Sequence, residues 1–219
     1  MARIAGRTYS RLDVTRAAWR VIVRDGLHNT TVRAIAKELG ATTGVVMYYF
    51  RDKDELMLFA LDRLGQGIQD EARRAVEGAT GIDRVLRLLT ATLPLGPRQE
   101  AGWRIWIGFV GHAMASPRLR DEHRRRLEIL SELVTKELRS LKQAGILKPG
   151  LNPRKEADAL IAMSDGIGLG HMLRPELYPP ARQWEIVRRF LEHLVVGGTE
   201  IPRRHDGTTA RRQDGKTAG

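Results

Sequence analysis

Residues 31–53 read TVRAIAKELGATTGVVMYYFRDK, and this stretch has the pattern of two short helices joined by a tight turn. Thr31 can cap the first helix, because a threonine hydroxyl accepts a hydrogen bond from an unpaired backbone N–H. Gly40 suits the left-handed end of that helix. Thr42 can cap the second helix, which runs to about Phe50. A helix whose start displays small and hydroxyl-bearing residues can enter the major groove of DNA.

The rest of the chain also has a helical pattern. Apolar residues recur at intervals of three and four, and no long alternating run of the kind typical of strands is present. This periodicity predicts an all-α protein without strands. We expect about nine helices, near residues 11–25, 31–39, 42–50, 53–77, 82–93, 98–115, 117–144, 157–173 and 181–195.

Glycine and proline breaks and a change of composition divide the chain into three parts. Residues 1–53 are expected to form an N-terminal arm and a three-helix domain with the two short helices. Residues 54–197 are expected to form a larger helical domain for ligand binding and dimerisation. Residues 198–219 are polar and nearly free of apolar side chains, so we expect a disordered basic tail.

The charge of the chain indicates a polyanionic partner. The formal net charge is +11 and the isoelectric point is near 10.6, which favours nucleic acid or an acidic membrane surface. Within residues 1–53, ten Arg and Lys residues stand against four Asp and Glu residues, a net charge of +6. Because this excess lies on the segment with the two short helices, double-stranded DNA is the expected partner and a membrane is not.

Several kinds of chemistry are not expected. The chain contains no cysteine, which excludes disulfides, thiolate metal sites and a cysteine nucleophile. His112 and His171 have no Cys or Glu neighbour at metal-ligand spacing, so we expect neither a metal site nor a cofactor. No apolar run approaches the ~18 residues that a membrane span needs. We expect a soluble cytoplasmic protein that is not an enzyme.

Four successive motifs are AAW followed by VI and glycine, then TVRAIAKELG, ATTGVVMYYF and K-EL. Together they resemble the N-terminal domain of TetR-type transcriptional repressors over about residues 11–60. The resemblance implies that the two short helices form a helix-turn-helix. It implies that the residues near base edges are Thr43, Gly44 and Val45. It implies that the residues near phosphates are Thr31, Tyr48, Tyr49 and Lys53.

The chemistry of these side chains agrees with a DNA-binding surface. Helix starts present unpaired N–H groups and a partial positive charge, so their tips suit phosphate oxygens. Gly44 lets the backbone come close to DNA, and Thr43 and Val45 can offer methyl groups to thymine. The candidate DNA-binding residues are Thr31, Arg33, Thr42, Thr43, Gly44, Val45, Met47, Tyr48, Tyr49 and Lys53.

Some of these assignments have an alternative. The family often carries Tyr where this chain has Met47, so that phosphate contact is lost or replaced by an apolar one. Tyr49 can be partly a core residue, and Arg33 can be a solvated helix residue. The N-terminal arm with Arg3 and Arg7 can reach a minor groove, although an untethered basic tail is the favoured interpretation.

The helix expected at residues 157–173 contains Gly166, Gly168 and Gly170, although each glycine in a helix interior costs ~1 kcal/mol relative to alanine. Close approach of a second helix would offset that loss. We therefore expect a homodimer whose last two helices form a four-helix bundle about a two-fold axis. The alternative is that the glycines pack against this chain's own sixth or seventh helix. The candidate interface residues are Ser164, Gly166, Gly168, Gly170, Trp184, Val187, Leu191 and Leu194.

The segments GWRIWIGFVGHAMASPRLRDEHRRR (102–126) and LIAMSDGIGLGHML (160–173) are similar to the C-terminal domain of the BetI-like branch of the TetR family. This resemblance implies a homodimer whose two helix-turn-helices fit the half-sites of a near-palindromic operator.

Aromatic side chains gather on the sixth expected helix and near the ends of later ones. Aromatic faces hold quaternary ammonium ions by cation–π attraction, which suits a choline-like or other cationic effector. Aromatics at helical spacing are more often core residues, and this alternative is favoured. Asp165 is interpreted as a hydrogen-bonded interface or capping residue. The candidate ligand-binding residues are Trp103, Trp106, Phe109, His171 and Tyr178.

The expected function is therefore a sequence-specific repressor, released from DNA by a small-molecule effector that the sequence does not identify. A second hypothesis is a constitutive DNA-binding regulator whose C-terminal domain only dimerises, which a body without a sizeable cavity would favour. A helical enzyme is a remote third hypothesis.

Overall fold

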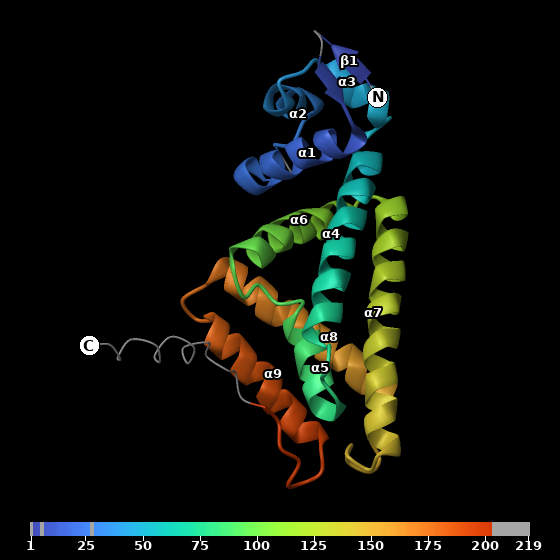
Figure 1. The fold of residues 1–219 in the computed structure, drawn as a ribbon, viewed down its shortest axis with the longest axis vertical. Coiled ribbons are helices and arrows are strands. Elements are labelled where there is room, and N and C mark those ends of the chain that lie inside the picture. The colour runs from blue at the N-terminus through green and yellow to red at the C-terminus, as the bar shows by residue number, and fades with distance from the viewer. Residues whose placement is uncertain (1, 5–6, 27–28, 203–219) are drawn as a thin grey trace, which may run out of the picture.

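The computed structural model describes residues 2–4, 7–26 and 29–202, with the backbone alone for residues 2–4, 7 and 53 (Figure 1). The strands are β1 (Ala2–Ile4) and β2 (Arg7–Tyr9). The helices are α1 (Arg11–Asp25), α2 (Val32–Leu39), α3 (Thr43–Tyr49), α4 (Lys53–Ala75), α5 (Gly81–Thr90), α6 (Pro97–Ala113), α7 (Pro117–Gln143), α8 (Pro153–Leu173) and α9 (Pro180–Leu194). The prediction of a mainly helical protein is confirmed.

Helices α1, α2 and α3 pack together at one end of the molecule, and we call them the head (Figure 1). Thr31 caps α2, since its hydroxyl oxygen accepts from the backbone N–H of Ala34 at 3.1 Å. Gly40 ends α2 with a left-handed φ of 68°. Thr42 precedes α3 as predicted, but its side chain makes no capping hydrogen bond. The core of the head contains Val14, Ala17, Ala18, Ile35, Ala36, Val45, Val46 and Phe50.

A two-stranded antiparallel hairpin precedes α1, so the prediction that the chain has no strands is wrong. Residues Arg3 and Thr8 lie opposite each other in its register, as do Ile4 and Arg7. The last residue of β2, Tyr9, is 4% exposed and packs in the core of the head. The N-terminal segment is therefore tethered, contrary to the favoured interpretation. Strands of three residues are too short to show an alternating pattern.

Helices α4 to α9 form the body. Its main core lies between α5, α7, α8 and α9 and includes Val85, Leu138, Leu160 and Leu191. Ile201 is 7% exposed and belongs to the same core, so the packed body continues beyond the predicted boundary at residue 197. The rest of the predicted tail, residues 203–219, lies outside the described residues.

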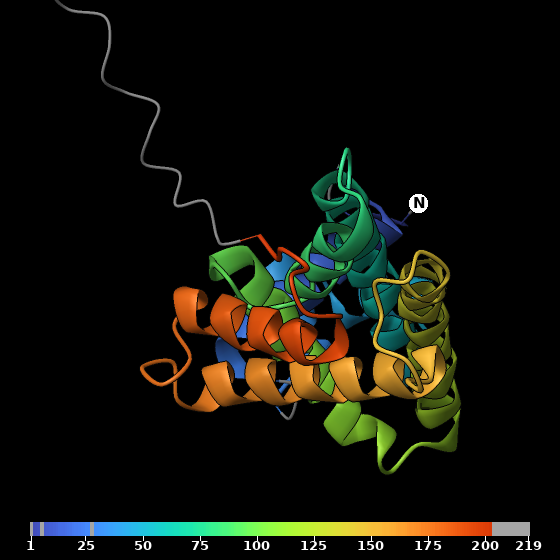
Figure 2. The same cartoon turned by 90° about the horizontal axis from the view of Figure 1, so that it is seen from below.

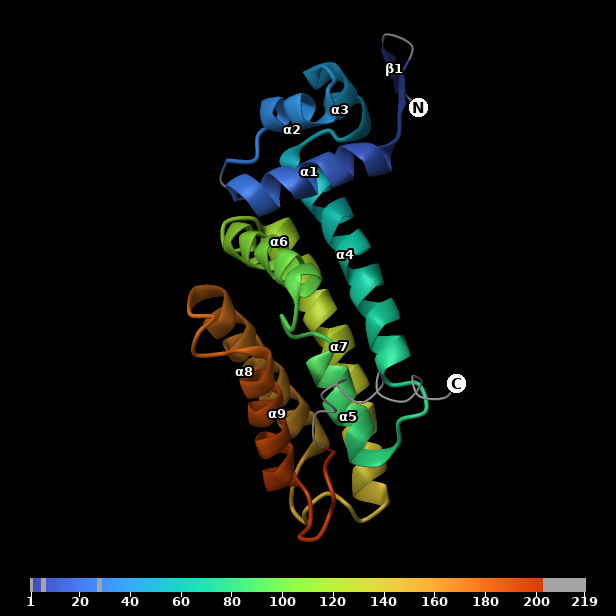
Figure 3. The ribbon, with the colours of Figure 1, turned by 60° about the vertical axis from the view of Figure 1, so that its left-hand side comes forward.

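Helices α1, α4 and α6 join the head to the body. Helix α6 crosses directly beneath α1 (Figures 1 and 3). A separate apolar cluster here combines Ile22 of α1, Met57 of α4 and Phe109 of α6. The predicted domains at residues 1–53 and 54–197 therefore share a packed junction.

Helices α8 and α9 run side by side (Figures 2 and 3). Two glycines of α8 admit aromatic rings of the same chain. A Cβ added to Gly168 would lie 2.1 Å from the ring of Trp103 on α6, and one added to Gly170 would lie 2.7 Å from the ring of Tyr178. These two residues were predicted to admit a second subunit, and that prediction is wrong, because the space above them is filled from within the chain. Gly166 has nothing within 4 Å of the corresponding position.

We predict that Gly168→Ala lowers the free energy of unfolding by roughly 1 to 3 kcal/mol, the usual cost of overpacking a core. The new methyl group would collide with the indole of Trp103. Chemical denaturation at fixed protein concentration measures the change. Gly111→Ala is the control, because that position in α6 is exposed and open, so the variant should gain up to about 1 kcal/mol of helix propensity. Equal stabilisation of both variants would contradict the packing assigned to Gly168.

Candidate functional site

The outer side of the head exposes most of the predicted DNA-binding residues. The exposed candidates are Thr31, Arg33, Thr42, Thr43, Gly44, Met47 and Tyr48. Met47 is 48% exposed and Tyr48 is 65% exposed, although both are large and largely apolar. Positions 43, 44, 47 and 48 recur at helical spacing, so they share one side of α3. We call this side of α3 the exposed tip.

Val45 does not belong to the exposed tip. It is 1% exposed and packs in the core of the head with Ile35 and Val46. The prediction that Val45 offers a methyl group to thymine is therefore wrong. A two-turn helix has one side for the core and one for solvent, and Val45 falls on the core side. Met47 instead shares the solvent side with Thr43.

Tyr49 links α3 to β2, because its hydroxyl group donates a hydrogen bond to the carbonyl oxygen of Tyr9. Its half-buried ring packs edge-on against the ring of Tyr48, with centroids 4.9 Å apart. The hydrogen bond to Tyr9 replaces the predicted phosphate contact, so the alternative of a partly buried Tyr49 is the better one. Lys53 begins α4, and its side chain lies outside the described residues.

The sequence interpretation missed Tyr9 as a residue that positions the head. Its hydroxyl group donates to the carbonyl oxygen of Gly40, in the turn between α2 and α3, at 3.0 Å. Gly40 and Tyr49 lie 31 and 40 residues away along the chain. No local pattern could therefore have shown that Tyr9 links the two helices of the turn.

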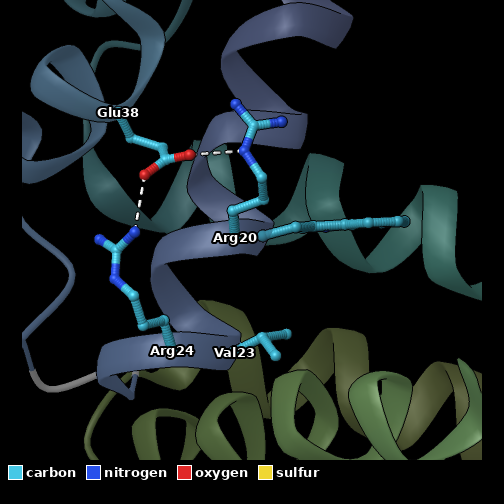
Figure 4. Close-up of a pocket in the computed structure, with 5 residues that line it drawn as sticks. Arg20, Val23, Arg24 and Glu38 are labelled. Atoms are coloured by element: carbon cyan, nitrogen blue, oxygen red, sulfur yellow. Dashed lines mark hydrogen bonds and ion pairs between the residues drawn. The ribbon is translucent and has the colours of Figure 1, made fainter. Parts of the chain in front are cut away.

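Ion pairs use much of the positive charge on α1. Arg20 lies 2.6 Å and Arg24 lies 2.8 Å from the carboxylate of Glu38 on α2 (Figure 4). Hydrogen bonds from Arg20 and Arg24 hold the pKa of Glu38 below its ordinary value. Arg33 and Lys37 on α2 are exposed and form no ion pair with the described residues. The net charge of +6 already subtracts Glu38, so these ion pairs leave the net charge unchanged and show that the unpaired positive charge lies on α2 rather than at Arg20 and Arg24.

Most predicted dimer-interface residues lie in the chain's own core. Val187 and Leu191 are fully buried, and Leu194 is 8% exposed. Ser164 is also buried, and its hydroxyl group donates to the carbonyl oxygen of Leu160 at 2.9 Å. Trp184 is half-buried against the same core. The prediction of an interface at the buried residues is wrong, because the stripe of apolar residues read from the sequence is the inner stripe.

Exposed apolar side chains of this region lie on α8, on α9 and in the loop between them. They are Leu169, Leu173, Leu177 and Phe190, with exposed fractions from 44% to 72%. Phe190 also lines a hollow of about 440 Å³ on the outer side of α9, together with Ile186 and Arg189. We call this surface the α8–α9 face.

The aromatic residues predicted to bind an effector are packed by the chain itself. Trp103 is 9% exposed and donates its indole N–H to the carbonyl oxygen of Thr92 at 2.9 Å. Trp106 is half-buried, with its ring centroid 4.9 Å from that of Trp103. Phe109 is 1% exposed in the junction between head and body. It is a core residue of this junction, and its role in ligand binding stays a prediction.

His171 and Tyr178 are also engaged. The Nδ1 atom of His171 lies 2.9 Å from the carbonyl oxygen of Tyr178, and its Nε2 atom lies 3.1 Å from Oε1 of Glu100. The ring of Tyr178 covers Gly170. Both ring nitrogens of His171 thus have partners within the chain, so this residue joins α6 to the end of α8.

The head and the body each match a known family model. Residues 14–59 match the model described as bacterial regulatory proteins, tetR family. Residues 81–196, which are more than half of the chain, match the model described as BetI-type transcriptional repressor, C-terminal. The chain belongs to the TetR family. It is a DNA-binding transcriptional regulator and not an enzyme, and both family resemblances read from the sequence are confirmed.

Known TetR-family relatives cover nearly the whole chain. The regulator PksA of Bacillus subtilis is 27% identical over 198 residues, which are 89% of this chain and 95% of the relative. The regulator BetI of Escherichia coli K12 is 25% identical over 205 residues, covering 89% of this chain and 98% of BetI. A transcriptional regulator from Saccharomonospora viridis, solved in complex with choline, is 24% identical with a TM-score of 0.79. That alignment covers 85% of this chain and 97% of the other, and it shows the shared fold.

In this TetR-family chain a polar contact adds to the apolar junction. Asp54, near the start of α4, accepts a hydrogen bond from the Ser116 hydroxyl group at 2.9 Å and lies 3.7 Å from Nε2 of His112. Asp52 caps α4 by accepting from the backbone N–H of Glu55. The corner between α6 and α7 is therefore attached to the helix that directly follows α3.

Asp165 is a half-buried carboxyl group on α8 of the TetR-family body. It forms no hydrogen bond or ion pair with the described residues, so a capping role within this chain is wrong, while a hydrogen bond across a subunit interface stays a prediction. Burial raises the pKa of Asp165 to about 6. Because residues three apart on a helix are neighbours, this carboxyl group stands one turn from Gly168, where the Trp103 ring rests.

None of the described helices is both long and apolar enough to cross a membrane.

Proposed function

We propose that the chain is a homodimeric repressor that binds a near-palindromic operator through the exposed tips of its two α3 helices. The observation that carries this proposal is the composition of that tip: Thr43, Gly44, Met47 and Tyr48 are exposed on one side of a short helix within a TetR-type head. Thr43 and Met47 can contact base edges, while Tyr48 and Arg33 can contact phosphates.

Dimerisation is supported by the α8–α9 face. Leu169, Leu173 and Phe190 are large apolar side chains exposed to solvent on two neighbouring helices, and large exposed apolar surface marks interaction sites. A two-fold axis through this face would pair α8 and α9 with the same helices of a second copy. The two heads could then reach half-sites one helical turn, about 34 to 36 Å, or a multiple apart.

We further propose that a small cationic molecule binds beside Asp165 and releases the operator. Asp165 is half-buried, has no partner among the described residues and stands one turn from the aromatic contact of Trp103 with Gly168. A quaternary ammonium ion would be attracted both to the carboxylate and to the indole face. A structural relative was solved with choline, and SmeT, a repressor of similar fold, was solved with triclosan.

A second function, constitutive DNA binding, is favoured by a specific observation. Trp103 already fills the space over Gly168, and neither of two hollows formed by described residues lies beside it. One hollow is at Trp19 on α1 and the other is on the outer side of α9. In this alternative the body only dimerises, and an effector would have to displace Trp103 to enter.

We predict that selection from random DNA duplexes yields a motif with two-fold symmetry. Tyr48→Phe should then weaken binding to the motif and to unrelated DNA alike, by roughly tenfold, because a charge-assisted hydrogen bond contributes about 1.5 kcal/mol or more. Thr43→Val should change the preferred bases, with about 1 to 3 kcal/mol of altered discrimination. Fluorescence anisotropy on both kinds of DNA checks this. The absence of any enriched motif would contradict the proposal.

We predict that Phe190→Glu converts the dimer to a monomer, because it places a charge on the α8–α9 face. Sedimentation equilibrium over a range of concentrations measures the change. Leu133→Glu is the matched control, since Leu133 on α7 is similarly exposed, at 41%, but lies outside this face. If only the Leu133 variant dissociated, the dimer would use α7 and the assigned face would be wrong.

We predict that choline weakens operator binding by the wild-type protein about five- to 150-fold, the usual range of allosteric coupling. Asp165→Asn should abolish this response, and Glu77→Gln, an exposed acid at the end of α4, should retain it. The Asp165 carboxyl group is ionised above its pKa of about 6, so the choline effect should fade as the pH falls through 6. Operator affinity that no quaternary ammonium compound changes would favour constitutive binding.

A further inference from the structure

The hairpin of β1 and β2 stands beside the exposed tip of α3. Both elements lie at the end of the molecule that is farthest from α5 and α9 (Figures 1 and 3). The hydrogen bond from Tyr49 in α3 to Tyr9 in β2 shows that the two elements are in contact. The surface that could face DNA is therefore broader than the helix-turn-helix alone.

Tyr9 fixes the base of the hairpin to both helices of the turn. Its side chain is buried at 4% exposure and donates to the carbonyl oxygen of Gly40 at 3.0 Å. Its own carbonyl oxygen accepts from Tyr49 at the end of α3. Ser10 directly after it caps α1, in a capping box with Asp13. The hairpin is thus anchored on α1, on the turn and on α3, and its base keeps a fixed position relative to the exposed tip.

The charged residues in the sequence of the hairpin are all basic. Its strands contain Arg3 and Arg7, and no Asp or Glu precedes Asp13 in the chain. A two-stranded hairpin by itself is marginally stable in water, so a partner that contacts both strands would favour its formation. Anchoring at Tyr9 also lowers the entropy that such a contact would have to offset, compared with a flexible arm.

We propose that this hairpin is a second DNA-binding element, which contacts the sugar–phosphate backbone next to the groove that α3 enters. The inference rests on the proposed operator binding by α3. It assigns to Arg3 and Arg7 a share of the affinity, and to Tyr9 the role of a positioning residue. DNA is the partner that fits, because the hairpin adjoins the exposed tip and its sequence contains two arginines and no acidic residue.

The test compares the wild-type chain with the double variant Arg3→Ala/Arg7→Ala on the selected operator with long flanks. Binding is measured between about 50 and 200 mM salt. Losing two phosphate contacts should reduce the slope of log affinity against log salt by about 2, and should weaken binding roughly tenfold or more. Hydroxyl-radical footprinting of the double variant should show protection lost at flanking backbone positions and kept at the centre.

A matched double variant, Arg74→Ala/Lys136→Ala, removes the same charge from the body. Both residues are exposed, form no ion pair with the described residues, and lie on α4 and α7 rather than in the head. Its salt slope should stay at the wild-type value. If the two double variants changed the slope equally, the effect would be one of net charge and the hairpin proposal would be overturned.

The two proposals fail in different ways. Wild-type protein that binds no two-fold operator would overturn the proposed function. Wild-type and Arg3→Ala/Arg7→Ala proteins that bind the operator with the same slope and footprint would overturn the role of the hairpin alone. Tyr9→Phe adds a second measurement, since it removes the bond to Gly40 but keeps the buried ring and the carbonyl oxygen. We expect the Tyr9→Phe variant to remain folded and to lose part of the footprint protection at the flanking backbone positions.

Discussion

Every contact of the head with DNA depends on how a helix of seven residues is held in place. Isolated helices of that length are not stable in water, and α3 contains only seven residues. Burial of Val45, Val46 and the following Phe50, each at most 2% exposed, holds α3 against the rest of the head. At roughly 1.5 to 3 kcal/mol for each buried side chain, this packing provides several kcal/mol. The exposed side chains on the outer side of α3 are therefore not needed to hold the helix in place.

Helix α6 contacts both the head and the rest of the body. Trp103 on α6 rests on Gly168 of the body, and Phe109 on the same helix packs against α1 at the junction. The two residues are six positions apart, which is about 9 Å along a helix. Under the proposed effector response, a displacement of Trp103 would be carried by this helix toward α1. Phe109 therefore has a structural reason to be aromatic and large without touching a ligand.

The sequence predicted the helices and the turn well, because each has a local cause. Thr31, Gly40 and the three-and-four spacing of apolar residues act over a few residues. The predictions that were wrong concern features without such a local cause. Val45 was assigned to DNA because a short helix offers too few positions to decide its inner side. The partners of Gly168, Glu38 and Tyr9 lie far along the chain, so spacing alone could show neither the packed glycine, nor the paired arginines, nor the anchored hairpin.

Helix α8 has two different sides within one turn, and this restricts how an effector could act. Gly168 faces inward to Trp103, whereas the next residue, Leu169, is exposed on the α8–α9 face. A molecule that entered beside Asp165 would have to separate α8 from Trp103. The same movement would shift Leu169 and its neighbours, and with them the relation between two subunits. A shift of 1.4 kcal/mol in that equilibrium changes operator affinity tenfold, so a small displacement of α8 suffices for regulation. In a constitutive regulator the contact of Trp103 with Gly168 would instead stay closed and fix the spacing of the heads.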